Sequence, residues 1–252
     1  MTEQHMPKGT SQSGGPSESS KTRFAEGLLL NEHFSTMQGE GSHTGKPSTF
    51  FRLQGCAVGC PWCDTKYTWK VNAANLVHYV ALANKAPGSP EFAIVEAAFL
   101  VRLAKEYGNN HVVFTGGEPC VYDLFKVTND LESLGFTTQI ETSGTHEISA
   151  DPGTFVTLSP KVDMPGGLVV LDDALLRADE IKMPVGKPAD ITTLQKLLAR
   201  RLEVRKSATA YHVPVYLQPL SMSKKATELC LEAARVNDWL VSVQTHKVAG
   251  LR

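Results

Sequence analysis

The chain has 252 residues, of which 42% are hydrophobic and 20% are charged, as is ordinary for a soluble globular enzyme. Its formal net charge of -1 gives no reason to expect nucleic acid or a membrane surface as a partner. No run of about 18 apolar residues predicts a transmembrane helix. Five cysteines, three of them close together, argue against a secreted disulfide framework and favour a reducing, cytoplasmic compartment.

The predicted elements follow a polar tail. Residues 1–23 are rich in Ser, Gly, Lys, Thr and Gln, so they are expected to be a disordered tail or a cloning remnant. Residues 24–252 are expected to form one domain with a full-sized core. The first predicted strand is 48–53, and further strands are predicted at 111–114, 136–140, 154–158, 179–182, 213–217 and 239–243. Helices are predicted at 92–107, 121–134, 172–177, 190–203 (with Asp190 as N-cap) and 223–236.

This alternation of strands and helices is typical of an α/β protein with a parallel sheet and helices outside it. Because six or seven strands fall short of the eight in a closed barrel, we expect an incomplete (βα)6-type barrel, open on one side. Most predicted strands end in glycine or polar residues, and in parallel barrels these ends meet on the active-site face. The strand-end residues are Thr115, Gly116, Gly117, Glu141, Ser143, Ser159, Lys161, Lys182, Gln218, Ser221, Gln244 and His246.

Three cysteines in one loop are the strongest chemical signal. Cys56, Cys60 and Cys63 have the spacing C-x3-C-x2-C, and such thiolate loops hold iron–sulfur clusters or zinc. A four-iron cluster on three thiolates has one iron free to bind a small molecule, such as the amino and carboxylate groups of a methionine moiety. Trp62 offers a flat aromatic face suited to stacking on a purine.

Two other interpretations of the cysteines are open. Structural zinc takes four ligands, and a fourth would have to come from a distant residue such as Cys120 or Cys230, neither of which has a paired spacing. Three unrelated core cysteines would not explain the Gly, Pro and Trp residues around them. The cluster interpretation is therefore favoured.

A second segment places a carboxylate, Glu40, between two glycines, where tight backbone can approach a ligand. Taken alone, an exposed turn is the better interpretation of this glutamate. Arg52, just before the cysteine loop, is predicted to be either a partner for Glu40 or a clamp for an anionic ligand.

The cysteine loop, with an aromatic residue before its third cysteine, resembles that of radical S-adenosylmethionine (SAM) enzymes. The turn at residues 115–119, Thr-Gly-Gly-Glu-Pro, resembles the G-G-E-P turn of the same enzymes. A narrower resemblance is to the 7-carboxy-7-deazaguanine synthase family. It is carried, in order, by residues 36–41, 51–56, 63–65, 139–145, 159–161 and 217–219.

The resemblance implies a radical SAM partial TIM barrel and a lyase reaction. The ring of 6-carboxy-5,6,7,8-tetrahydropterin would be contracted to 7-carboxy-7-deazaguanine with loss of ammonia, on the way to queuosine and other 7-deazapurines. A 5′-deoxyadenosyl radical would take a hydrogen from the pterin C6. A [4Fe–4S] cluster, SAM and Mg²⁺ would be the cofactors. A homodimer and an external electron donor such as a flavodoxin are also implied.

The resemblance further implies the residues of the site. Cys56, Cys60 and Cys63 would hold the cluster, and Thr65 would give Mg²⁺ a hydroxyl ligand. SAM would contact Trp62, Gly117, Glu141, Ser143, Ser159, Pro160, Lys161, Gln218, Pro219, Leu220 and Ser221. The pterin would contact Met37, Gln38, Gly39, Glu40, Arg52, Thr115 and His246.

Two other functions remain as alternatives. A glycyl-radical activating enzyme shares the cysteine spacing, but it usually carries extra cysteine clusters, which this sequence lacks. A non-catalytic zinc-binding protein is the second alternative.

Overall fold

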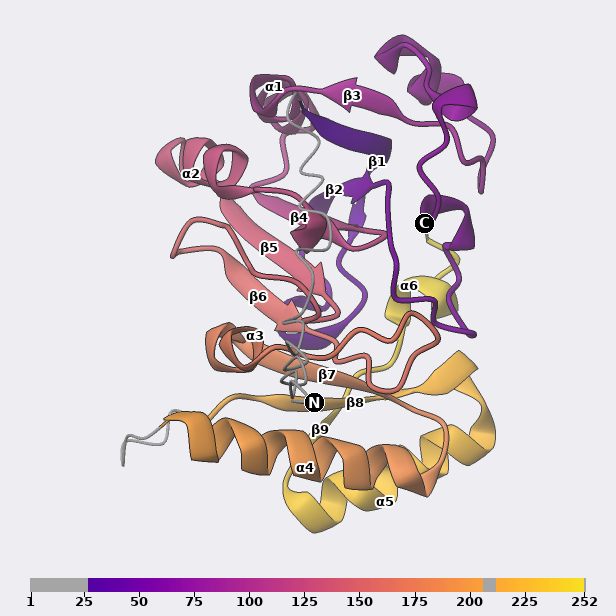
Figure 1. The fold of residues 1–252 in the computed structure, drawn as a ribbon, viewed down its shortest axis with the longest axis vertical. Coiled ribbons are helices and arrows are strands. Elements are labelled where there is room, and N and C mark those ends of the chain that lie inside the picture. Colours follow the sequence, from indigo (N-terminus) through magenta and orange to yellow (C-terminus); the bar gives the residue numbers. More distant parts are fainter. Residues whose placement is uncertain (1–26, 206–211, 252) are drawn as a thin grey trace, which may run out of the picture.

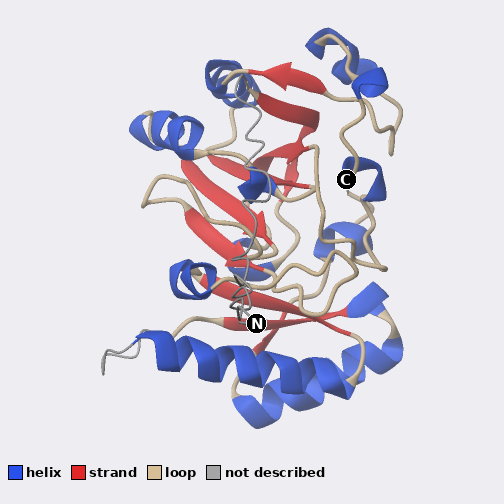
Figure 2. Ribbon diagram, viewed as in Figure 1, coloured by secondary structure: helices blue, strands red, loops and turns tan. Residues whose placement is uncertain are grey.

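The computed structural model describes residues 27–205 and 212–251, so the tail expected at residues 1–23 lies outside the described part. Within it, nine strands form one curved sheet in the order β3-β1-β2-β4-β5-β6-β7-β8-β9 (Figure 1). Helices α1 to α5 lie along one side of this sheet, and the short α6 lies on the other side (Figures 1 and 2). No helix among the described residues is long and apolar enough to cross a membrane.

The strands and helices have the following bounds. The strands are β1 (Leu28–Met37), β2 (Pro47–Leu53), β3 (Ala93–Val95), β4 (His111–Gly116), β5 (Thr137–Thr142), β6 (Phe155–Leu158), β7 (Glu180–Val185), β8 (Val215–Pro219) and β9 (Leu240–Val241). The α-helices are α1 (Ala97–Tyr107), α2 (Phe125–Ser133), α3 (Asp172–Arg177), α4 (Pro188–Arg205), α5 (Lys224–Asn237) and α6 (Thr245–Val248).

The expected open barrel is confirmed. Parallel pairings join β2, β4, β5, β6, β7, β8 and β9 in turn. The sheet does not close, because β9 lies at one end of the strand order and β3 at the other. The antiparallel pair β1 and β3, which the sequence did not predict, extends the sheet beyond β2. The strand predicted as the first of the chain is therefore its second.

Three further element predictions were wrong in detail. Residues 93–95 form strand β3 rather than the start of a helix, because Ala93 and Val95 alternate with exposed Ile94 and pair with β1. The helix predicted at 121–134 begins only at Phe125, after a separate 3₁₀ turn. Asp190 lies inside α4 rather than at its N-cap. Its carboxylate accepts hydrogen bonds from the backbone N–H groups of residues 186 and 187, at 2.8 and 3.0 Å.

The two faces of the parallel strands carry different side chains. One face is apolar and packs against the helices, as with Ile181, Met183 and Leu217. The alternate positions are polar and point into the barrel, as with Glu141 and Lys182, whose side chains are bonded to each other across strands. Because side chains alternate along a strand, a slip of one residue would exchange these faces. The alternation of apolar and polar residues along each strand therefore forms the apolar core on one face and the polar interior on the other.

The loop between β1 and β2, residues 38–46, reaches into this polar interior. Its base is closed by hydrogen bonds between Gln38 and residues 45 and 46, at 2.7 and 2.8 Å. Inside the barrel, the Ser42 N–H donates to buried Glu180 at 2.8 Å, and the Gly41 N–H donates to Ser242 at 2.9 Å. Gly41 has φ +65°, and a Cβ there would meet the Glu180 carboxylate at 2.2 Å. The loop thus carries Glu40 into the barrel.

Stability at acidic pH should depend on His111, which is fully buried between Thr137 Oγ1 (2.7 Å) and Gln139 Oε1 (2.9 Å). Burial lowers the pKa of His111 to about 4. Below pH ~6.5 the His111 imidazole binds a proton in the unfolded chain, whereas in the folded chain it stays neutral until the pH approaches its lowered pKa. We therefore predict that the free energy of unfolding falls between pH 6.5 and 4, by up to about 3 kcal/mol from this residue.

Urea denaturation across this pH range would measure the effect. His111→Gln should flatten the pH dependence, whereas His78→Gln, at an exposed position, should leave it unchanged. Parallel pH curves for wild type and His111→Gln would contradict the prediction.

Candidate active site

A cavity of about 510 Å³ opens where the parallel strands end. Its lining includes the cysteine loop, the 38–40 segment and the chain after β9. The strand-end positions predicted from the sequence to share one face therefore do meet there. Only Pro160, among the residues assigned by resemblance, does not line the cavity; it is buried behind the lining.

The cysteine loop presents three free thiols to the cavity. Cys56, Cys60 and Cys63 all line it, and none forms a disulfide. Cys63 accepts a hydrogen bond from the Trp69 indole at 3.4 Å. Burial raises the pKa of the Cys56 thiol to about 11 and also raises that of Cys60. Cys56 and Cys60 therefore stay protonated until a metal displaces their protons.

The backbone around this loop is packed too closely for side chains. A Cβ on Gly117 would lie 2.2 Å from the Gly55 carbonyl oxygen, and a Cβ on Gly166 would lie 1.9 Å from that of Ala57. The Gly166 N–H also donates to the Val58 carbonyl at 3.0 Å. These contacts fix the loop from two sides while its thiols stay open to the cavity.

The donor set fits an iron–sulfur cluster. Three soft sulfur ligands on one short loop are typical of such a cluster. In the described part of the chain, no group of three or more His, Cys, Asp or Glu side chains could hold a single metal ion.

Glu118, in the turn after β4, braces the cavity wall. It is buried, and its Oε1 accepts hydrogen bonds from the Cys120 N–H (3.0 Å) and the Thr142 hydroxyl (2.6 Å). Its Oε2 accepts hydrogen bonds from the Ser143 N–H at 2.8 Å and from the Ser143 hydroxyl. Glu118 thereby ties the ends of β4 and β5 together. The sequence marked it only as part of the G-G-E-P turn.

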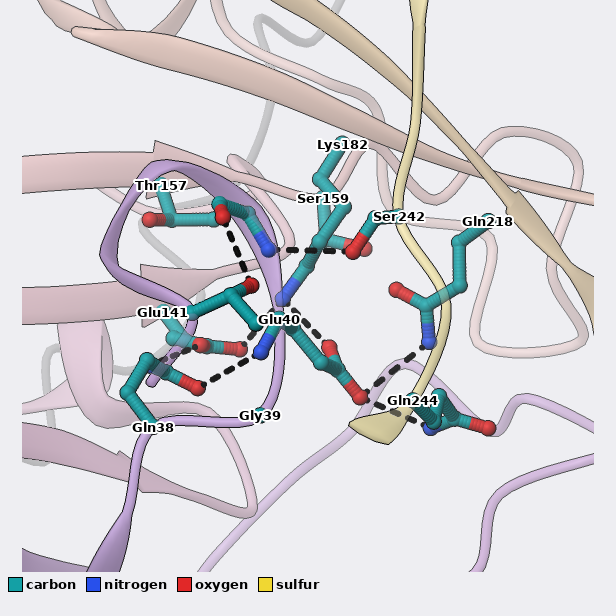
Figure 3. A network of polar contacts seen from close by, with 12 residues as sticks. Gln38, Gly39, Glu40, Glu141, Thr157, Ser159, Lys182, Gln218, Ser242 and Gln244 are labelled. Carbon is teal, nitrogen blue, oxygen red and sulfur yellow. Dashed lines mark hydrogen bonds and ion pairs between the residues drawn. The ribbon is translucent and has the colours of Figure 1, made fainter. Parts of the chain in front are cut away.

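The centre of the cavity floor is a network around Lys182 (Figure 3). Its ammonium lies 2.5 Å from Glu40 Oε2 and 2.9 Å from Glu141 Oε2. Gln38 Nε2 donates to Glu141 Oε1 at 3.0 Å, and Gln244 Nε2 donates to Glu40 Oε1 at 2.7 Å. Lys182 lies inside β7 and not at its end as predicted, because the strand continues to Val185, whereas Gln244 does follow the last strand, β9. The sequence assigned neither residue a role. Only the fold shows that both converge on Glu40.

Opposing effects set the charges in this network. Burial by itself raises the pKa of Glu40, but the charge and hydrogen bond of Lys182, with help from Gln244, bring it down to about 2. Burial lowers the pKa of Lys182, but Glu141 and Glu40 outweigh that effect and raise it above its usual value. Glu40 and Lys182 are therefore both charged at neutral pH, although their side chains are largely buried.

The expected pairing of Arg52 with Glu40 is wrong. Arg52 Nε donates instead to Glu32 on the neighbouring strand β1, at 2.6 Å, and Glu32 also accepts the Tyr67 hydroxyl at 3.0 Å. Arg52 still lines the cavity, so the second expectation, a clamp for an anionic ligand, remains open. The sequence could not show this partner, because β1 was not predicted as a strand.

The remaining wall carries Lys161 and His246. Lys161 donates to the Ser159 carbonyl and hydroxyl oxygens at 2.7 and 2.6 Å, and burial lowers its pKa. His246 packs so closely on Gly39 that a Cβ there would meet its ring nitrogen at 2.1 Å. The end of the chain therefore closes over the segment that carries Glu40.

An open parallel barrel with a three-cysteine loop and a G-G-E-P turn at its strand ends defines a radical SAM enzyme. The 7-carboxy-7-deazaguanine synthase of Escherichia coli (strain K12) is 46% identical over 220 residues, which cover 86% of this chain and 96% of that protein. The protein of the same name from Buchnera aphidicola subsp. Schizaphis graminum (strain Sg) is 40% identical over 225 residues, or 88% of this chain and 98% of that protein.

A solved structure agrees with these relatives. The crystal structure of QueE from Escherichia coli matches 90% of this chain and 99% of its own, with a TM-score of 0.81 and 43% identity. No family model matches the chain. The chain belongs to the 7-carboxy-7-deazaguanine synthase family.

Binding of the iron–sulfur cluster should depend on the absence of a side chain at Gly117. In Gly117→Ala the new methyl group would clash with the Gly55 carbonyl, so the turn or the cysteine loop must shift, at a cost of about 1–3 kcal/mol. We predict much less iron and sulfide per chain after anaerobic reconstitution. Gly153→Ala, in an exposed loop, is the control. Equal iron content in Gly117→Ala and the control would contradict the prediction.

Proposed function

We propose that this cavity binds 6-carboxy-5,6,7,8-tetrahydropterin beside SAM, and that the enzyme converts the pterin to 7-carboxy-7-deazaguanine with loss of ammonia. The observation that carries the proposal is that three free thiols and the largely buried, ionised Glu40 line the same cavity. When bound, a [4Fe–4S] cluster supplies the electron that breaks the sulfonium carbon–sulfur bond of SAM. Cys56, Cys60 and Cys63 are the residues that would hold it.

The pterin is assigned to the side of the cavity that holds Glu40. A pterin has a guanidine-like edge of N–H donors, and an ionised carboxylate is the acceptor that suits it. Arg52 would bind the carboxylate or a ring carbonyl of the substrate, because Glu32 engages its Nε and so orients the guanidinium. Met37, Gln38, Gly39, Thr115 and His246 would complete this side, and all five line the cavity.

SAM is assigned to the side nearest the cysteine loop. Glu141 would accept the ribose hydroxyls, and the ammonium of Lys161 would bind the methionine carboxylate. Ser143, held by Glu118, would present a fixed hydroxyl. Trp62 would stack on the adenine. The other proposed contacts are Gly117, Ser159, Pro160, Gln218, Pro219, Leu220 and Ser221.

Mg²⁺ is assigned to Thr65. This residue precedes a 3₁₀ turn, but its side chain makes no capping hydrogen bond to that turn. Its hydroxyl lies 3.5 Å from the Gly116 carbonyl oxygen, which is the outer limit for an O–H···O hydrogen bond, and 3.5 Å from Cys63 Sγ, which is a weak hydrogen-bonding partner. The hydroxyl is therefore weakly engaged and can serve a hard cation that prefers oxygen ligands.

The substitution Thr65→Ala tests this assignment. Loss of one oxygen ligand should raise the Mg²⁺ concentration for half-maximal activation at least about tenfold, which corresponds to roughly 1.4 kcal/mol. Thr227→Ala, on α5 and away from the cavity, is the matched control. An unchanged Mg²⁺ dependence in Thr65→Ala would mean that the ligand is misassigned.

The reaction itself is tested by anaerobic turnover of 6-carboxytetrahydropterin by the cluster-loaded enzyme, with and without Mg²⁺. Mass spectrometry should find 7-carboxy-7-deazaguanine, in greater amount with Mg²⁺. SAM cleavage without any deazapurine would instead favour a glycyl-radical activating enzyme. A protein that loads zinc and no iron would favour a zinc-binding protein.

The wider setting is also a proposal. We expect residues 24–252 to act as one domain, in the cytoplasm and as a homodimer, with an external one-electron donor such as a flavodoxin. Family resemblance supports the donor and the homodimer. Trp62, which is 40% exposed beside two cysteines, supports access for a donor protein to the cysteine loop.

A further inference from the structure

Lys182 connects two carboxylates that have different proposed ligands. Its side chain, from β7, is only 2% exposed. One ammonium bonds both Glu40, from the loop between β1 and β2, and Glu141, at the end of β5. Under the proposed function, Glu40 binds the pterin and Glu141 binds the ribose of SAM. A single cation therefore lies between the two binding sites.

A second bridge closes these contacts into a ring. Gln38 donates from its Nε2 to Glu141 Oε1 at 3.0 Å, and its Oε1 accepts the backbone N–H of Glu40 at 3.2 Å. Lys182 thus joins the two carboxylates directly, while Gln38 joins the Glu141 carboxylate to the backbone N–H of Glu40 (Figure 3). A shift at one corner of such a ring changes the hydrogen bonds at the next.

The charges make this ring sensitive to Lys182. Two carboxylates share one ammonium. Other titratable groups that act on the network include Lys161, near Lys182 and Glu141, His43, near Glu141, and His246, near Glu40. Lys161 bonds only to Ser159 among the described residues, so it bridges neither carboxylate. Without Lys182, two largely buried carboxylates, whose side chains are 14% and 18% exposed, would face each other with no bridging cation, an arrangement that the interior of a protein disfavours.

We propose that Lys182 is a positioning residue that couples binding of the pterin to binding of SAM. When pterin donors engage Glu40, they fix that carboxylate and, through Lys182, fix Glu141 in the position that receives the ribose. The ligand that binds first therefore orders the side chains that the second ligand would otherwise have to order. Each ligand should thus increase the affinity of the enzyme for the other. By thermodynamic reciprocity the factor is the same in both directions. This inference rests on the proposed function.

The test is the dissociation constant of SAM with and without saturating 6-carboxytetrahydropterin. It is measured by anaerobic calorimetry on the cluster-loaded enzyme, without reductant, so that neither ligand is consumed. In the unaltered enzyme the pterin should tighten SAM binding at least about fivefold, the lower end of typical coupling. We call the SAM dissociation constant without the pterin, divided by that with it, the coupling ratio. In Lys182→Met the coupling ratio should fall to about one, even if the separate affinities for SAM and the pterin also change.

Lys161→Met is the matched control, because it removes a second buried lysine of the same cavity. It should weaken SAM binding but keep the coupling ratio, since its hydrogen bonds go to Ser159 and not to Glu40 or Glu141. If Lys182→Met does not fold, the double variant Lys182→Met with Glu141→Gln removes a cation and an anion together. Its ratio should also be about one.

Two results would overturn the proposal: no coupling in the unaltered enzyme, or an unchanged ratio in either Lys182 variant. Product formation by the unaltered enzyme separates this failure from a failure of the proposed function. If the deazapurine forms but the ratio of the SAM dissociation constants without and with the pterin is the same in the Lys182 variants, only the coupling proposal is rejected. If no deazapurine forms, the assignments of the pterin to Glu40 and of SAM to Glu141 are rejected as well.

Discussion

The cavity is organised around a buried ammonium shared by two largely buried carboxylates. Lys182 keeps Glu40 ionised in a place where burial alone would favour its neutral form. That charge is what makes the floor of the barrel an acceptor for N–H donors rather than an apolar pocket. The polar interior strands, the loop that carries Glu40 and the closing C-terminal segment all converge on this contact (Figure 3).

The two halves of the cavity are built by different means. The cysteine loop is local: its three ligands lie within eight residues and its shape depends on glycines packed against neighbouring backbone. The acceptor side is assembled from distant parts of the chain, with Glu40, Lys182 and Gln244 brought together by the barrel. Glu118 joins the halves, because it holds the wall beside the cysteines to the end of β5. The fold thus places a one-electron site and a polar substrate site against each other.

This difference explains what the sequence could predict. The cysteine spacing, the strand-end polar residues and the parallel open barrel follow from local patterns, and the structure confirms the barrel and the shared face. The partners of Glu40 and Arg52 do not follow, because they depend on strand register and on a loop entering the barrel. Residues 92–96 were mistaken for helix because their apolar residues fit both periods, and only pairing with β1 selects the strand. Asp190 was misplaced because acidic residues suit both the N-cap and the first turn.

The most direct test of the central claim is a crystal structure of the cluster-loaded enzyme with both SAM and 6-carboxytetrahydropterin bound. The account predicts that the N–H edge of the pterin lies on Glu40, that the ribose of SAM lies on Glu141, and that Lys182 remains between the two carboxylates. A pterin bound away from Glu40, or a Lys182 that contacts neither carboxylate in the complex, would contradict it.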